Sequence, residues 1–221
     1  MVISKFWLRV CGIFGILGAL VLFSGDMLFY YDSVQENLKI NMANASDLRI
    51  KLSTITALFA SWFYLLGLVP VYYAFAPTTQ RARNTVLISF AAILVAYGVI
   101  HGAYVAIATT SKLAMQNNLD ISQATMLASD ANMLLRLFIY PVFAIFSFVF
   151  IKQVWQNKTH YPRWIIFFFP LVPFLFQGLL KMMLTGSLKT IIMGGFLNII
   201  LFIFFTASTV ALWKYPLNKE K

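Results

Sequence analysis

Long apolar stretches alternate with short polar ones along the whole chain. Six of the apolar stretches are about 20 residues or longer, the length that a helix needs to cross about 30 Å of hydrocarbon. They cover residues 6–31, 52–76, 85–110, 131–154, 162–184 and 188–213. Strands would leave backbone groups unpaired in lipid, and no stretch alternates like a barrel strand. The pattern therefore predicts an all-α, polytopic transmembrane helical bundle with six spans.

The composition agrees with a membrane location. Of the 221 residues, 61% are hydrophobic and only 11% are charged. So few charged residues cannot cover a surface that faces water on all sides. The polar connections are too short to form a separate globular unit, so residues 1–221 are predicted to form a single transmembrane domain. Any functional site must then lie within the bundle or on its rim.

Several classes of protein are excluded. The net charge of +10 is spread over the loops and forms no basic stripe, so we expect no nucleic-acid partner. Cys11 is the only cysteine, which excludes a disulfide scaffold. The two histidines, His101 and His160, are predicted to lie far apart, and no nucleotide-binding or hydrolase motif occurs. We therefore predict no metal, no cofactor and no catalytic residue.

The distribution of lysine and arginine predicts the orientation, because short loops rich in these residues stay in the cytoplasm. With the N-terminus inside, the inner side carries ten basic residues and the outer side six. The inner set is Lys5, Arg9, Arg81, Arg83, Lys152, Lys158, Arg163, Lys214, Lys219 and Lys221, and the outer set is Lys39, Arg49, Lys51, Lys112, Lys181 and Lys189. Both termini are therefore predicted to be cytoplasmic.

A few polar side chains interrupt the apolar stretches. A charged residue at the centre of a span costs about 2.5 to 3.5 kcal/mol, so each one needs a physical reason. Because successive spans run in opposite directions, these residues are predicted to share one depth in the outer half of the bilayer. We therefore predict a polar cavity that binds a ligand or couples to an ion, formed by Asp26, His101, Tyr104, Arg136, Gln177 and Lys181.

A purely structural interpretation competes with the cavity. Asp26 could pair with Arg136 or with Lys181 and hold two helices together, with His101 as a hydrogen-bonded neighbour. Arg136 and Lys181 could also extend to the headgroups, since both lie near the ends of spans. His101 lies deepest of the charged candidates and is a residue type that can act as a proton-linked switch, so it is the least easily explained by packing alone.

Proline and small residues predict details of the helices. Pro170 and Pro173 each remove a backbone donor, so we expect a kink or a break in the stretch 162–184. Small residues recur every four positions, at Gly15 and Ala19 and again at Gly98, Gly102 and Ala106. This spacing lets helix backbones approach closely, so we expect these positions to mark contacts inside the bundle.

The stretch from Gly25 to Tyr30, at the end of the first span, resembles that of small six-helix bacterial membrane proteins grouped as a domain family of unknown function. The resemblance implies no chemistry. It implies a multi-pass protein of the cell membrane, in particular the bacterial cytoplasmic membrane.

Three classes of function remain open. The first is binding or transport of a small amphipathic or anionic molecule or a lipid, with Arg136 and Lys181 as its cationic contacts and His101 as a proton-linked switch. The second is an intramembrane hydrolase acting on lipid, which ranks lower because no nucleophile or metal set is evident. The third is an accessory or structural subunit without site chemistry. Membrane lipid is the expected partner in each case, and a small-molecule ligand, a partner membrane protein or a homodimer are further alternatives.

Overall fold

The computed structural model describes residues 4–32 and 36–213, which form helices and connections but no strand. Lys214, Lys219 and Lys221, which enter the count of basic residues above, lie outside this part of the chain. In chain order the elements are α1 (Lys5–Tyr30), α2 (Leu38–Asn44), α3 (Asp47–Ala74), α4 (Gln80–Gln116), α5 (Ile121–Ala124), α6 (Met126–Trp155), the 3-10 helix η1 (Arg163–Phe168), α7 (Leu171–Leu175), α8 (Gln177–Met183), α9 (Gly186–Gly194) and α10 (Phe196–Trp213).

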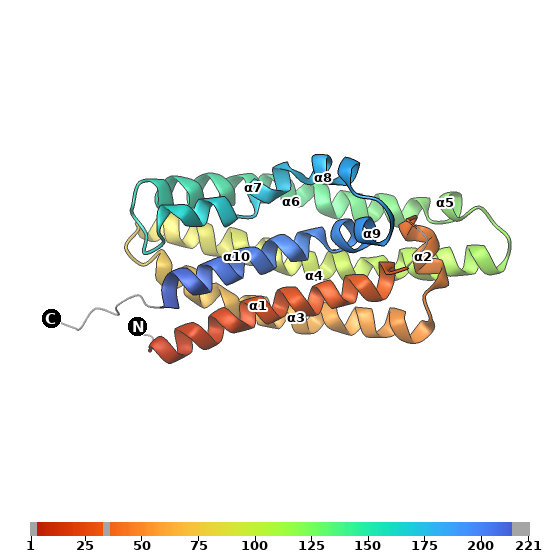
Figure 1. Ribbon diagram of the computed structural model, residues 1–221, viewed down its shortest axis with the longest axis horizontal. Coiled ribbons are helices and arrows are strands. Elements are labelled where there is room, and N and C mark those ends of the chain that lie inside the picture. The colour runs from red at the N-terminus through yellow and green to blue at the C-terminus, as the bar shows by residue number, and fades with distance from the viewer. Residues whose placement is uncertain (1–3, 33–35, 214–221) are drawn as a thin grey trace.

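Five of these helices, α1, α3, α4, α6 and α10, are long and apolar enough to cross a membrane. They run side by side along the long axis of the molecule (Figure 1). α1 packs between α3 and α10, α4 packs between α3 and α6, and η1 closes the ring between α6 and α10. The expected helical bundle is therefore present, with five helices of spanning length in the described residues.

The expected span 162–184 is not a single helix. η1 ends at Phe168, Pro170 precedes α7, and the single residue Phe176 separates α7 from α8. Pro170 cannot donate a backbone hydrogen bond and lies at the break between η1 and α7, whereas Pro173 lies within the short α7. The predicted break is confirmed, whereas the total of six spans remains a prediction.

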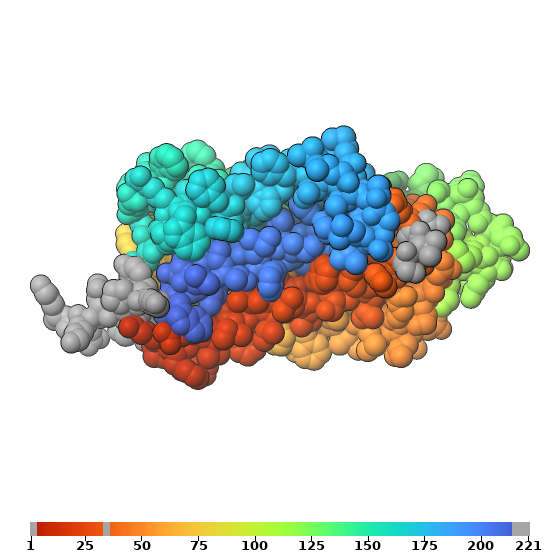
Figure 2. Space-filling view, viewed as in Figure 1, coloured from red at the N-terminus to blue at the C-terminus, as the bar shows by residue number. Residues whose placement is uncertain are grey.

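The expected span 188–213 is also divided. α9 ends at Gly194, and α10 begins only after Gly195. Glycine is the weakest helix former apart from proline, and two in succession favour a break. Figure 2 shows the interrupted segment 163–194, in teal to light blue, lying along the outside of α10.

The first and last long helices meet at one end of the bundle (Figure 1). The guanidinium of Arg9 in α1 donates to the backbone oxygen of Trp213 at the end of α10 over 2.9 Å, and it stacks on the Trp213 ring. At the opposite end of the bundle, the guanidinium of Arg49 at the start of α3 donates hydrogen bonds to the last carbonyl oxygens of α1. Cations at helix C-termini satisfy these free carbonyls, so both ends of α1 are fixed by arginine.

Two apolar clusters fill the bundle. The larger one contains a stack of aromatic rings between α4, α6, η1 and α10, with ring centroids 4.6 Å apart for Phe90 and Phe146 and 4.5 Å apart for Phe150 and Phe169. The smaller cluster surrounds Phe29 and connects α1 to α2 and α4. Polar side chains lie between the two clusters.

Glycine allows α1 and α3 to approach closely. A Cβ atom added to Gly67 would lie 2.6 Å from the Cα atom of Gly15, closer than real Cβ contacts. Gly98 is equally tight against Ser61, so the small residues at Gly15 and Gly98 mark contacts as expected. Gly102 does not, because a Cβ atom there would meet nothing within 4 Å.

Gly67→Ala should therefore destabilise the bundle, while Gly102→Ala should not. Overpacking costs about 1–3 kcal/mol, and the obstacle here is backbone that cannot rotate away. We expect thermal unfolding in detergent to show a melting temperature lowered by several degrees for Gly67→Ala. Equal melting temperatures for the two variants would contradict the close approach of α1 and α3.

A polar contact holds α9 against the connection that precedes α2. Glu36 accepts hydrogen bonds from the Lys189 ammonium and from the backbone N–H of Gly186. These bonds, that of Lys189 first, lower the pKa of Glu36 below its usual value of 4.5. A lowered pKa in the folded state means that the contact stabilises the fold above pH 4.5 and is lost as the pH falls through the folded-state value.

Acidification should therefore loosen α9. Amide hydrogen exchange in residues 186–194 should accelerate as the pH falls below about 4.5, relative to the intrinsic exchange rate at each pH. In Glu36→Gln the same residues should exchange faster at neutral pH and show no further acceleration. An unchanged acid response in Glu36→Gln would disprove the role of this carboxylate.

Candidate functional site

Asp26 is buried one turn before the end of α1, with 7% of its surface exposed. Its neighbour Gly25 makes room for the site. A Cβ atom on Gly25 would lie 2.0 Å from the Thr56 hydroxyl and 3.0 Å from Nε2 of His101. The adjacent Gly25 and Asp26 thus let a ring from α4 come between α1 and α3 and reach the carboxylate.

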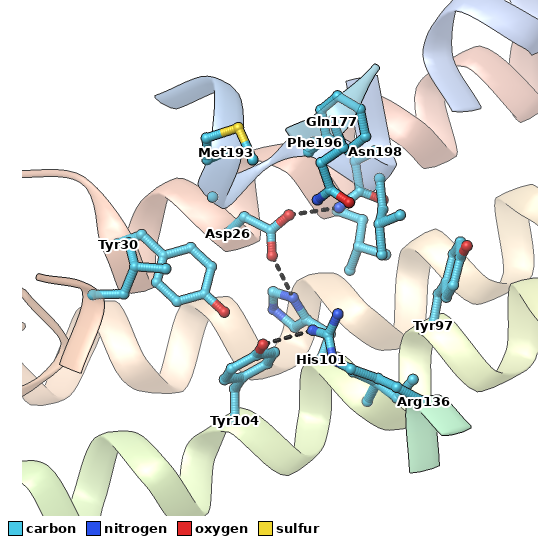
Figure 3. A pocket seen from close by; sticks show the side chains of 15 residues that line it. Asp26, Tyr30, Tyr97, His101, Tyr104, Arg136, Gln177, Met193, Phe196 and Asn198 are labelled. Carbon is cyan, nitrogen blue, oxygen red and sulfur yellow. Dashed lines mark hydrogen bonds and ion pairs between the residues drawn. The ribbon is translucent and has the colours of Figure 1, made fainter. Parts of the chain in front are cut away.

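That ring is His101, which is 97% buried and bonded on both sides. Its Nδ1 lies 3.0 Å from Oδ1 of Asp26. Its Nε2 lies 2.9 Å from the hydroxyl and 3.1 Å from the backbone oxygen of Ser53 in α3. Asp26 and His101, two of the predicted site residues, are therefore in direct contact (Figure 3).

The second oxygen of Asp26 is held from α10. Nδ2 of Asn198 donates to Oδ2 of Asp26 over 2.6 Å. The Tyr64 hydroxyl in α3 donates to Oδ1 of Asn198 over 2.9 Å. Because that oxygen accepts from Tyr64, the amide must turn its NH₂ group toward the carboxylate. Four helices, α1, α3, α4 and α10, thus converge on Asp26.

The hydrogen-bond directions determine the charge of the pair. The Ser53 hydroxyl donates to the Gly25 carbonyl oxygen over 2.7 Å, so its oxygen is left to accept from His101. The Ser53 carbonyl can only accept. Nε2 of His101 must therefore carry a hydrogen, and a second proton lies between Nδ1 and Asp26. Whichever of these two atoms holds that proton, the network assigns the pair no net charge.

The order Asp26, His101, Ser53 resembles a Ser-His-Asp catalytic triad. In such a triad the imidazole takes a proton from the serine, which requires a bare Nε2. Here Nε2 carries a hydrogen, and Ser53 donates its own to Gly25. Ser53 also has no exposed surface. In this arrangement Ser53 is a structural hydrogen-bond partner and is not activated as a nucleophile.

Arg136 approaches the site from α6. Its Nη2 donates to the Tyr104 hydroxyl over 2.6 Å, and its Nε donates to Oδ1 of Asn132 over 3.1 Å. Asn132 is in turn anchored to the backbone oxygen of Ile100. Among the described residues no carboxylate lies within 4.0 Å of the guanidinium. The anticipated ion pair of Asp26 with Arg136 or Lys181 is therefore wrong, because His101 takes that place.

A cavity of about 140 Å³ lies against these groups (Figure 3). Five of the six predicted residues line it, namely Asp26, His101, Tyr104, Arg136 and Gln177. Lys181 does not: its side chain is exposed, since α8 lies at the periphery and has no buried residue. Ligand pockets for whole drug-sized molecules usually measure about 300–1,000 Å³, so this cavity has room for a small polar group only.

The sequence interpretation missed several members of the site. Ser53 and Tyr64 were not singled out, although both are polar side chains on one face of an apolar stretch. Tyr30 and Asn198 also line the cavity, and Tyr30 packs edge-on against Tyr104. Helical spacing alone does not indicate which polar side chains of different helices meet.

The described residues contain no group of three or more His, Cys, Asp or Glu side chains that could hold a metal ion. Asp26 and His101 offer two ligands, and both Asp26 oxygens and both His101 nitrogens are already engaged.

Fold and site together define the class of protein: an all-helical, membrane-compatible chain with a buried polar network beside a small cavity. Residues 4–215 match the family of unknown function DUF6796, so the chain belongs to that family, and the resemblance drawn from Gly25 to Tyr30 is confirmed. No curated protein and no solved structure matches the chain.

The stability losses caused by replacing Asp26 and His101 should not be additive. His101→Leu leaves a buried carboxylate without its proton partner, a change that typically costs about 3–5 kcal/mol. We expect Asp26→Leu combined with His101→Leu to lose less than the sum of the two single losses, as measured by denaturant or thermal unfolding in one detergent. Additive losses would show that the two side chains do not depend on each other.

Proposed function

We propose that this protein binds an amphipathic anion within the membrane, with the anionic group in the cavity beside Arg136. One observation carries the proposal: Asp26 and His101 neutralise each other, so the guanidinium of Arg136 is left as the net charge that faces the cavity. A partly buried cation without a carboxylate favours an anionic ligand.

The side chains around Arg136 fit such a ligand. Tyr104 and Asn132 hold the guanidinium in place through two of its nitrogens, and Nη1 makes no hydrogen bond to the described residues. Gln177 lines the same cavity, and its side-chain amide has no hydrogen-bond partner among the described residues. An incoming phosphate or carboxylate could therefore accept from Nη1 and from the Gln177 amide without displacing an existing bond.

The proposed setting is the bacterial cytoplasmic membrane. The end of the bundle where α1 begins and α10 ends carries Arg9, Arg81, Arg83 and Lys152, and we assign it to the cytosol by its basic residues. The cavity then lies in the outer half of the bilayer, near the end of α1. The cavity is small and lies within the bundle, which suits the headgroup of a membrane amphiphile.

Transport of the same anion is the second candidate, and the interrupted segment favours it. Gln177 of α8 and Gly194 of α9 both line the cavity, so two of the short helices border the site. Broken helices that line cavities are typical of transporters, where they let one part of the bundle move against the rest. The adjacent Asp26–His101 pair holds a proton that such a movement could release.

The test is the affinity for a defined anion. Dodecyl phosphate, titrated into the purified protein in a non-ionic detergent, should bind Arg136→Gln at least about tenfold more weakly than wild type, because a charge-assisted hydrogen bond is lost. Arg83→Gln is the matched control, since Arg83 also stacks on a tyrosine but lies away from the cavity. Equal affinity of wild type and Arg136→Gln would refute the proposal.

A further inference from the structure

A surface groove continues the cavity along α6. Next to the polar cavity lies a second space of about 90 Å³, which shares Tyr97, Arg136 and Gln177 with it. This second space in turn shares Tyr140, Phe143 and Phe174 with a groove of about 760 Å³ between α6 and α7. The three spaces form one series that starts at the guanidinium and ends on the outer surface of the bundle.

The groove exists because of the break in the chain at Pro170. α7 is only five residues long, contains no buried residue, and packs against η1, α8 and α10. On the α6 side, Ala144 and Ser147 are small and leave a depression between larger neighbours. A continuous helix packed along α6 would have filled this space with side chains.

The walls of the groove suit a hydrocarbon chain. Their surface is almost entirely apolar, and Phe148, Ile151 and Leu171 contribute to it. The groove runs along α6 toward Lys152 and Trp155, the pair of residue types that marks a membrane interface. From Arg136 to Ile151 the helix rises about 22 Å, at about 1.5 Å per residue. One leaflet of hydrocarbon is about 15 Å thick, so a full acyl chain fits within this length.

A second apolar hollow on the bundle differs from the groove of α6 and α7 in its relation to the polar cavity. Between α3 and α4, residues including Leu68, Leu87 and Ile88 line a hollow of about 550 Å³. It shares no residue with the polar cavity. The lining residues of the groove of α6 and α7 lead to Arg136, and so do those of a smaller hollow of about 500 Å³ between α4 and α6, which shares Ile100 with the polar cavity. Of these two, the groove of α6 and α7 is the larger and lies beside the break in the chain, and these two features distinguish it from the hollow between α4 and α6.

From this continuity we infer that a single hydrocarbon chain of the bound anion lies in the groove between α6 and α7, and that the ligand enters sideways from the bilayer through this gap. The inference rests on the proposed function and adds the class of ligand: a single-chain amphiphile with a phosphate or carboxylate head. The head lies at Arg136 and Gln177, and the chain extends past Phe143 toward Ile151.

The experiment uses dodecyl phosphate with a photoreactive diazirine near the end of its chain, added to the protein in phosphatidylcholine nanodiscs. A dodecyl chain extends about 14 Å, which is about nine to ten residues of helix, so we expect saturable labelling of residues 143–148 in α6 and 171–175 in α7, competed by unlabelled dodecyl phosphate. Ala144→Trp fills the groove and should reduce this labelling at least about fivefold. Ile88→Trp, which places the same ring in the hollow between α3 and α4, should leave it unchanged.

Melting temperatures of both tryptophan variants should equal that of wild type, since both positions are on the surface. If Ala144→Trp fails to fold, Phe148→Asp supplies a charge to the same groove and should reduce labelling in its place. The inference that the hydrocarbon chain lies in the groove would be overturned if labelling were spread evenly over the lipid-facing helices and were unaffected by Ala144→Trp or Phe148→Asp. If Arg136→Gln still weakened dodecyl phosphate binding in that case, the proposed anion site would survive without the groove; if it did not, both would fall.

Discussion

A carboxylate inside an apolar helix bundle is the constraint on which this structure depends. Asp26 can remain there only because a proton and two hydrogen-bond donors offset its charge. His101 supplies the proton and one donor, and Asn198 supplies the other. Ser53 and Tyr64 then orient these two partners from α3. The requirement to neutralise one side chain thus determines the relative register of four helices.

The proposed function depends on Arg136, which lies outside this network. Because Asp26 is satisfied by His101, it is not available to Arg136, which is held by neutral partners instead. The cavity therefore has a positive charge on one wall and a neutral, fully bonded network on the other. This asymmetry is the reason for proposing an anionic ligand. The interrupted segment α7–α9 borders the same site and is the proposed route of entry.

Much of this arrangement could be predicted from the sequence, and the reasons are physical. Span length and alternating direction placed Asp26, His101, Tyr104 and Arg136 at one level, because polar residues in lipid are costly enough to stand out. Proline chemistry predicted the break near Pro170. The direction of each hydrogen bond could not be predicted, since it depends on contacts between helices that the spacing within one helix does not encode. Lys181 was misplaced for the same reason: its position on α8 says nothing about whether α8 faces inward.

The most direct measurement is an experimental density map of the protein in nanodiscs that contain an anionic single-chain amphiphile. The account predicts a compact headgroup density against the Arg136 guanidinium, a thin chain density between α6 and α7, and Asp26 in contact with His101 and Asn198 as described above. A map in which the guanidinium turns to the Asp26 carboxylate, and the cavity closes around that ion pair, would contradict it.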